Sequence, residues 1–222
     1  MELYDVMRTT FAARDFTDDP VPDEVLHRIF DNARFAPSGG NRQGQKVIVV
    51  RDPDRKKKLG LLCDPALRVY DKQRQAGEFP WNTIIPTKID VEEARNTPSE
   101  ALPIFRAMDD VPVVLVVTVD LRRVASTDKE LDRIGVSSGG SIYPFAWNIV
   151  LAARNEGYGG TMTTLIASAE PEVQELLDLE PFEAVAALIP IGKPVKQLTK
   201  LRRVAVEEFA FRESGKGEPF EL

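Results

Sequence analysis

Hydrophobic residues recur along the chain with two different periods. Spacing of three and four residues, typical of a helix with one buried face, is clearest between Pro22 and Arg34. Further helices are predicted at 2–9, 53–62 and 171–177. Residues 141–156 are apolar almost all round, and Gly157 is placed to cap their end. This helix is therefore predicted to be buried between elements or between subunits.

Short apolar runs predict strands at 46–50, 113–119 and 184–191. The run 113–119 is almost entirely β-branched, which is typical of a strand covered on both faces. It therefore predicts the centre of the sheet. No internal repeat or linker divides the chain, so residues 1–222 are predicted to form a single domain.

The segment 64–110 departs from this regular pattern. It carries prolines at 80, 86, 98 and 103 and two short charge-rich pieces, and is predicted to be an insertion of mixed helix and loop. Its exposed-looking aromatic residues are Tyr70, Phe79, Trp81 and Phe105. Two interpretations stand at this point: a surface excursion that packs on its own side chains, or a lid over a binding site.

Composition excludes several classes of protein. The 222 residues are 43% hydrophobic, enough for a sizeable core, and no run reaches the roughly 18 apolar residues of a membrane helix. The first residues resemble no signal peptide, so a soluble, cytoplasmic chain without a membrane partner is expected. The net charge of −6, with no long basic block, argues against nucleic acid as a partner.

Reactive side chains are scarce in this chain, which favours a reaction carried by a bound cofactor. Cys63 and His27 are the only residues of their types, which excludes an intrachain disulfide, a zinc cluster and triads of the Ser-His-Asp or Cys-His kind. No metal site and no catalytic side chain are predicted, and neither residue is assigned a role. A bound cofactor would supply the missing reactivity.

The turn at 36–43 is the strongest candidate for a cofactor contact. Its glycines allow close approach of the backbone to a planar ligand, and its amide side chains both donate and accept hydrogen bonds. That combination suits the polar edge of a flavin ring, although an ordinary surface turn has the same composition. The residues of interest are Pro37, Ser38, Gly39, Asn41 and Gln43.

Several motifs in one unbroken order give the turn its context. These are Arg8 to Thr17, the turn itself, Ser141-Ile142-Tyr143-Pro144, the stretch 152–161 and Ile189-Pro190-Ile191-Gly192-Lys193-Pro194. In combination they resemble the nitroreductase family of FMN enzymes over nearly the whole chain. The resemblance implies an α+β fold, a three-layer α/β/α arrangement around a mainly antiparallel sheet. It also implies an obligate homodimer with FMN at the interface.

The resemblance also implies which residues hold the FMN phosphate. Arg14 matches the N-terminal phosphate arginine of the family. Phe11 and Ala12 stand where many relatives have a second basic residue and a serine, so part of that contact is either missing or supplied by Arg8 and Thr10. From the C-terminal side, Arg203, or its neighbour Arg202, is expected to return to the phosphate.

For the flavin ring, the resemblance implies contacts from the segment that follows the 141–156 helix. Gly159, Gly160 and Thr161 are expected to lie against the ring face, and backbone amides near Thr163 and Thr164 to donate to flavin N5. A Rossmann domain is rejected, because these glycines do not match G-x-G-x-x-G and follow a helix instead of a strand. Phe79, Trp81 and Phe105 are expected to contact the substrate from the lid.

The expected function is an oxidoreductase in which NAD(P)H reduces FMN. The reduced flavin then reduces a nitroaromatic, a quinone or an activated alkene in a ping-pong cycle. Other readings remain open: another flavin reaction of the family, such as dehydrogenation or reductive dehalogenation, a non-enzymatic flavin-binding protein, or a cofactor-free dimeric interaction module.

Overall fold

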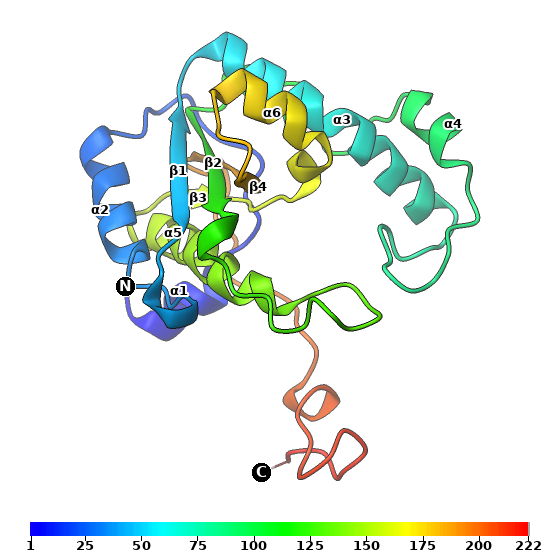
Figure 1. Cartoon of the computed structure of the whole chain (residues 1–222). Helices are drawn as coiled ribbons and strands as arrows, with labels where there is room; N and C mark the ends of the chain where they lie inside the picture. Colours follow the sequence, from blue (N-terminus) through cyan, green and yellow to red (C-terminus); the bar gives the residue numbers. More distant parts are fainter. Residues whose placement is uncertain (222) are drawn as a thin grey trace.

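Four antiparallel strands form the central sheet of the computed structural model, which describes residues 1–221. Their order is β1 (Gln45–Val50), β2 (Val113–Asp120), β4 (Glu183–Gly192) and β3 (Gly159–Gly160). β2 pairs with β1 on one side and β4 on the other, and only its last residue is not fully buried (Figure 1). The prediction that 113–119 forms a doubly covered central strand is confirmed.

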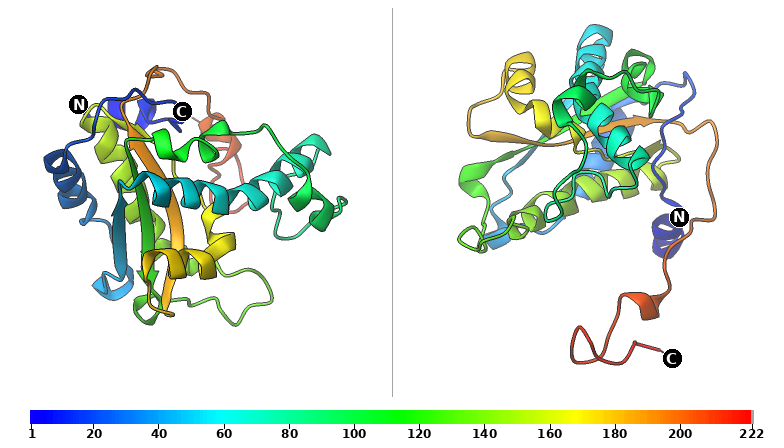
Figure 2. Two further views of the ribbon diagram at one scale, coloured as in Figure 1. Left: turned by 90° about the horizontal axis from the view of Figure 1, so that it is seen from above. Right: turned by 90° about the vertical axis from the view of Figure 1, so that its right-hand side faces the viewer.

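Helices cover both faces of this sheet. Side chains of β2 alternate between the two faces, so Leu115 and Val117 meet one core while Val114 and Val116 meet the other. The first core contains α2 (Asp23–Ala33) and α5 (Tyr143–Asn155); the second contains α3 (Pro53–Gln75) and α6 (Glu170–Leu177). Figure 2 shows the helices on either side of the sheet. The predicted three-layer α/β/α fold is confirmed.

The N-terminal segment runs along the β3 edge of the sheet. After α1 (Leu3–Thr9), which packs against α5, Ala12 pairs with Gly160 and Phe16 pairs with Pro194. The N–H of Ala13 donates to the carbonyl of Gly160 at 3.2 Å. These contacts fix the backbone on both sides of Arg14 and so place its side chain beside the residues that follow β3.

α3 is longer than its sequence pattern indicates. It was predicted to end near residue 62, but it continues through Pro65 to Gln75. Leu67 and Val69, on the far side of the proline, are fully buried, and that burial outweighs the hydrogen bond that Pro65 cannot donate. The segment 64–110, here called the arm, therefore begins inside a continuous helix and not in a loop.

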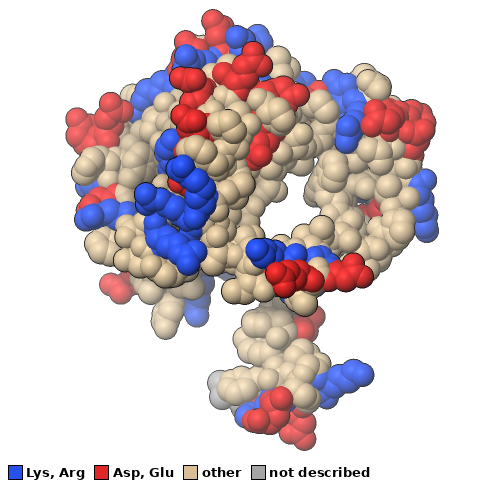
Figure 3. Space-filling view, viewed as in Figure 1, with Lys and Arg blue, Asp and Glu red and all other residues tan. Residues whose placement is uncertain are grey.

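Buried polar residues hold the returning part of the arm against α3. Beyond α4 (Val91–Asn96), the hydroxyl of Ser99 donates to the carboxylate of Asp71 at 2.6 Å, and Arg106 donates to the carbonyl of Ser99 at 2.6 Å. The guanidinium of Arg106 also lies 3.7 Å from the buried carboxylate of Asp64. The arm projects to one side of the body, and an opening separates the two in Figure 3.

The chain after β4 leaves the body as a strap, residues 195–221 (Figures 1 and 2). Gln197 anchors its start by donating to the carbonyl of Thr9 at 3.0 Å. From Leu198 to Glu221, the hydrogen bonds that the structure describes stay within the strap. No helix in residues 1–221 has the length and apolar character needed to cross a bilayer.

Candidate functional site

A cavity of about 330 Å³ lies where the N-terminal segment, the stretch after β3 and the arm meet. These three parts of the chain are far apart in sequence. The pairing of residues 12–16 beside β3 joins the first two, and contacts of α3 with the 3₁₀ turn Leu165–Ala169 bring the arm to them. The residues lining the cavity are Arg14, Tyr70, Pro80, Trp81, Leu102, Phe105 and residues 161–165. Six of the residues predicted to contact the cofactor or the substrate are among them: Arg14, Trp81, Phe105, Thr161, Thr163 and Thr164.

Arg14 is the cation of this cavity. Its side chain is exposed, and the single bond recorded for it is a long one of 3.4 Å to the carbonyl of Ala12. Its guanidinium therefore retains most of its donors for a ligand, in a geometry that suits a phosphate or carboxylate. Arg14 has the position and the free donors that the predicted phosphate contact requires.

The two backbone amides predicted to face flavin N5 differ in availability. The N–H of Thr163 donates to the carbonyl of Leu188 at 3.0 Å, which continues the pairing of this segment with β4. The N–H of Thr164 has no hydrogen-bond acceptor within residues 1–221, and Thr164 is exposed at the cavity. Of the two, Thr164 is the donor that a flavin nitrogen can use.

The glycines before the cavity have a packing explanation. Gly157 ends the turn after α5 with φ +86°, a conformation that favours glycine. Gly159 and Gly160 are buried, and a Cβ on Gly159 would lie 2.7 Å from the ring of Pro194 and 2.9 Å from the Cβ of Ala13. Close packing of the chain on itself thus explains these glycines, and their contact with a flavin stays a prediction.

The three predicted substrate aromatics occupy different surroundings. Trp81 lines the cavity and is 43% exposed, whereas Phe105 lines it from within the α3 core and is only 3% exposed. The sequence interpretation of Phe105 as exposed is wrong, because the short 3₁₀ turn at Pro103–Phe105 directs it inward. Phe79 lines a different cavity of the arm, and Tyr70, which was not assigned to the site, takes a place in the wall.

Arg8 and Thr10 were predicted to supplement the phosphate contact. Arg8 is exposed on α1, with its guanidinium 6.0 Å from the ring centre of Tyr4. Thr10 is buried, and its hydroxyl donates to the carbonyl of Val6 at 2.7 Å. Neither lines the cavity that holds Arg14, and the Thr10 hydroxyl is already engaged at the end of α1.

Hydrogen bonds within the turn at 36–43 hold its shape. The N–H of Gln43 donates to the hydroxyl of Ser38 at 3.0 Å, and the N–H of Asn41 donates to the Ser38 carbonyl at 2.8 Å. Asn41 and Gln43 both have positive φ, +52° and +48°, which costs backbone energy at non-glycine residues. In this conformation the amide side chains of Asn41 and Gln43 both lie at the exposed surface. Contact of these side chains with a cofactor stays a prediction.

Within one chain, the turn at 36–43 and Arg14, whose neighbour Ala13 bonds to Gly160, lie at opposite corners of the sheet. Gly44, directly after the turn, accepts a bond from Asp120 at the end of β2, whereas Gly160 pairs with Ile191 beside the start of β2. At roughly 3.3 Å per residue along β2 and roughly 4.8 Å between strands, these corners are about 25 Å apart. One copy of the chain does not close both groups around one flavin ring.

A carboxylate that sequence reasoning missed organises the loop opposite the turn. Asp128 is buried and accepts bonds from the hydroxyl of Ser137, the N–H of Val136 and the guanidinium of Arg133. These donors hold the pKa of the Asp128 carboxyl well below its usual range. The loop then leads into the 3₁₀ turn Ser137–Ser141, and the N–H of Gly39 donates to the Ser141 hydroxyl at 3.0 Å.

Arg202 and Arg203 lie in the strap. Arg203 donates to the carbonyl of Arg202 at 2.7 Å, both side chains are exposed, and neither lines the cavity. His27 is exposed on α2, while Cys63 is buried in the α3 core. Residues 1–221 contain no cluster of three or more His, Cys, Asp or Glu side chains able to hold a metal ion.

The model of the nitroreductase family matches residues 7–193. Iodotyrosine deiodinase 1 of Homo sapiens is 25% identical over 202 residues, which cover 89% of this chain and 63% of the relative. FMN reductase [NAD(P)H] of Bacillus subtilis is 25% identical over 213 residues, covering 91% and 70%. The chain thus spans less than two thirds of the length of the human relative.

A solved structure supports the fold. The crystal structure of a putative nitroreductase in complex with FMN from Desulfovibrio desulfuricans superposes with a TM-score of 0.64 at 18% identity. The superposition covers 96% of this chain and 98% of that one. At this identity the likeness concerns the arrangement of the α/β/α layers.

Proposed function

The chain belongs to the nitroreductase family, and on that premise we propose that it is an FMN-dependent oxidoreductase that uses NAD(P)H to reduce quinones, nitroaromatics or activated alkenes. The observation that carries the proposal is the cavity lined in common by Arg14, whose guanidinium keeps most of its donors free, by Thr164, whose N–H has no acceptor within residues 1–221, and by the aromatic Trp81. An anion site, a donor and a planar wall are the three contacts that FMN needs. A relative named for FMN reduction supports the same reading.

In this proposal the side chains bind and orient, and the cofactor carries the electrons. When bound, FMN supplies reversible two-electron chemistry that the residues of this chain lack. Arg14 holds the phosphate, the N–H of Thr164 faces the ring, and Trp81 with Tyr70 forms the wall on which a planar substrate stacks. His27 and Cys63 lie outside the cavity and take no part.

We infer that a second copy of the chain completes the site. The exposed turn at 37–43 is one argument, because its amides are too far from Arg14 to reach the same flavin within one chain. The outer side of α5 is another: Tyr143 and Trp147 are exposed there, next to exposed Leu3 and Tyr4 of α1. A group of exposed apolar side chains on adjacent helices favours an interface at this surface.

The strap adds a third argument for the homodimer. Its course leads away from the body, and it carries the exposed residues Val204, Phe209 and Phe211. Packed on a second copy, the strap would bury these residues and carry Arg202 and Arg203 toward that copy.

Complementation between two variants tests this shared site. Arg14→Ala and Asn41→Ala would each disable both sites of a homodimer. If one site takes Arg14 from one chain and Asn41 from the other, a mixed dimer carries one doubly altered site and one intact site. Refolding the two variants together should then restore up to about a quarter of the wild-type FMN binding, since about half the dimers are mixed. Absence of any recovery, with mixed dimers present, would contradict the shared site.

Ping-pong kinetics test the reaction. NAD(P)H and the acceptor are expected to use the same cavity in turn, so double-reciprocal plots at several acceptor concentrations should be parallel lines. Intersecting lines would indicate that both substrates bind together. Reductive dehalogenation is the second candidate, favoured by the similarity to iodotyrosine deiodinase 1. It predicts that a halophenol is converted to the phenol, with hydride replacing the halogen and halide released.

A further inference from the structure

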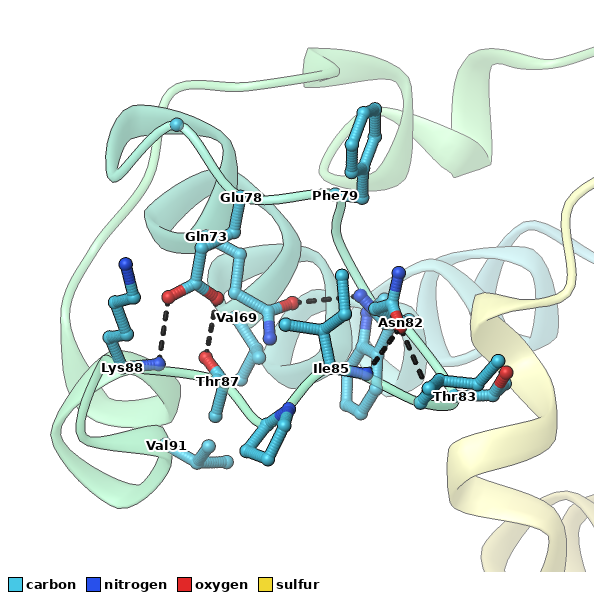
Figure 4. A pocket seen from close by; sticks show the side chains of 14 residues that line it. Val69, Gln73, Glu78, Phe79, Asn82, Thr83, Ile85, Thr87, Lys88 and Val91 are labelled. Carbon is cyan, nitrogen blue, oxygen red and sulfur yellow. Dashed lines mark hydrogen bonds between the residues drawn. The ribbon is translucent and has the colours of Figure 1, made fainter. Parts of the chain in front are cut away.

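A second cavity of about 500 Å³ lies in the arm, and every residue that lines it falls between 69 and 91 (Figure 4). Its wall is largely apolar, with Val69, Phe79, Ile84, Ile85, Pro86 and Val91 among the lining residues. Ile84 is 87% exposed and Ile85 is 61% exposed. Exposed aliphatic residues around a cavity of this size are typical of a small-molecule site.

Two side chains that accept hydrogen bonds, those of Glu78 and Asn82, fix the loop around this cavity. Figure 4 shows the carboxylate of Glu78 bridging the loop, where it accepts from the hydroxyl of Thr87 at 2.6 Å and from the N–H of Lys88 at 2.7 Å. The side chain of Asn82 accepts from the N–H groups of Ile84 and Ile85, at 2.9 and 2.7 Å. The loop is therefore built in advance of any ligand, which lowers the entropic cost of binding.

Trp81 connects this cavity with the candidate site, because it lines both. The backbone N–H of Trp81 donates to the side-chain oxygen of Gln73 at 2.9 Å, and Gln73 is itself buried. This bond keeps Trp81 at φ +55°, a strained conformation for an aromatic residue. A residue whose backbone is strained and anchored thus lines both cavities.

Resting on the proposed function, we propose that the arm cavity is a second compartment of the acceptor site, which binds the aliphatic side chain of a quinone whose ring stacks beside Trp81. The lining chemistry favours this ligand over a second part of NAD(P)H. A diphosphate needs cationic partners, and Lys88 is the one basic residue among the lining residues. The other charged lining residue, Glu78, is an anion that accepts hydrogen bonds within the loop. An alkyl or isoprenoid chain needs only apolar contacts.

The test compares two quinones with the same ring on the FMN-loaded protein. One is menadione, and the other is a naphthoquinone with a geranyl side chain at the ring position that menadione leaves free. Binding is followed by quenching of Trp81 fluorescence in a Trp147→Phe background, since these are the two tryptophans of the chain. The tailed quinone should bind about tenfold or more tightly than menadione, from the added buried apolar area.

Two matched variants decide whether the arm cavity causes that preference. Ile85→Asp places a charge in the cavity wall, and Ile134→Asp places one on an equally exposed isoleucine outside it. Ile85→Asp should remove the preference and leave menadione binding within about twofold, whereas Ile134→Asp should keep it. Equal binding of the two quinones by the parent, no binding of either, or a preference that survives Ile85→Asp would overturn the proposal.

The proposed function is tested separately from this compartment. If NAD(P)H-reduced protein fails to pass electrons to menadione, the proposed reaction is wrong, yet the fluorescence comparison still decides whether the arm binds the tail. If menadione is reduced and the tail preference is absent, the reaction stands and the second compartment is wrong.

Discussion

The backbone N–H of Gly39 donates to the side-chain oxygen of Ser141 at 3.0 Å, which joins two turns 102 residues apart in sequence. Both turns contain the triplet Ser-Gly-Gly, at 38–40 and 138–140. The first turn presents the amides of Asn41 and Gln43, and the second begins α5. Ser141 thereby fixes the candidate flavin turn to the helix that we propose for the dimer interface.

Ser141→Ala tests this link. The substitution leaves the N–H of Gly39 without its acceptor, at a cost of about 1 kcal/mol, which corresponds to about fivefold weaker FMN binding if the turn contacts the flavin. The measurement is an FMN titration of the apoprotein. Ser168→Ala is the matched control, because its exposed hydroxyl bonds locally to the carbonyl of Leu165. Weakened folding with unchanged FMN affinity would mean that Ser141 serves packing alone.

Arg14→Ala should weaken FMN binding by about tenfold or more, from loss of a charge-assisted bond of roughly 1.5–3 kcal/mol. The sharper readout compares FMN with riboflavin, which has no phosphate. Arg14→Ala should reduce the preference for FMN, and Arg203→Ala should do the same if the strap returns to the phosphate. Arg95→Ala, an exposed arginine on α4, is the control. An equal loss of affinity for FMN and riboflavin would mean that Arg14 contacts a part of the ligand other than the phosphate.

Substitutions of Phe105 and Trp81 should have different effects, one on stability and the other on acceptor specificity. Phe105→Ala removes a buried side chain from the α3 core and should lower the free energy of unfolding by about 3–5 kcal/mol. Trp81→Ala removes a half-exposed aromatic side chain from the cavity lining. It should instead change the ratio of kcat/KM between large and small acceptors at constant FMN content. Urea unfolding and steady-state kinetics of both variants check this division. The reverse assignment of effects would contradict the geometry.

Cys63 should affect alkaline stability and not catalysis. Burial raises the pKa of its thiol to about 12, from an ordinary value of 9.0. The folded state therefore keeps the thiol neutral where the unfolded state ionises it, and this contribution to stability is full below about pH 9 and is lost as the pH rises toward 12. Cys63→Ala should flatten the fall of unfolding free energy over that window.

The same variant has a catalytic prediction. Neither Cys63→Ala nor His27→Gln should change activity by more than a few-fold after correction for FMN content, because both side chains lie outside the cavity. A loss near a thousandfold with FMN still bound would reveal a thiol or acid step worth roughly 4 kcal/mol of barrier.

The sheet and its layers were predictable because their signals are local. A β-branched run such as 113–119 indicates a covered strand wherever it occurs, and the apolar spacing of α2 indicates which face is buried. The end of α3 was not predictable in this way. Pro65 is a helix-breaking signal, and only contacts with residues distant in sequence, around Leu67 and Val69, outweigh it.

The candidate site shows the same division. Arg14 was identified from its motif, and the structure gives it a cavity with free donors. The occupied N–H of Thr163 depends on pairing with Leu188, which no local pattern encodes. Asp128 carried no motif, because its three donors come from a loop whose course is set by the fold.

An anaerobic titration of the FMN-loaded protein with NAD(P)H tests the central claim most directly. The account predicts that the visible absorbance of the flavin bleaches with an equimolar amount of NAD(P)H, and returns in full when an equimolar amount of menadione is added. Parallel samples of Arg14→Ala, adjusted to equal FMN occupancy, should bleach to the same extent. Flavin that stays oxidised with excess NADH and with excess NADPH, or that is reduced and then not reoxidised by a quinone or a nitroaromatic, would contradict it.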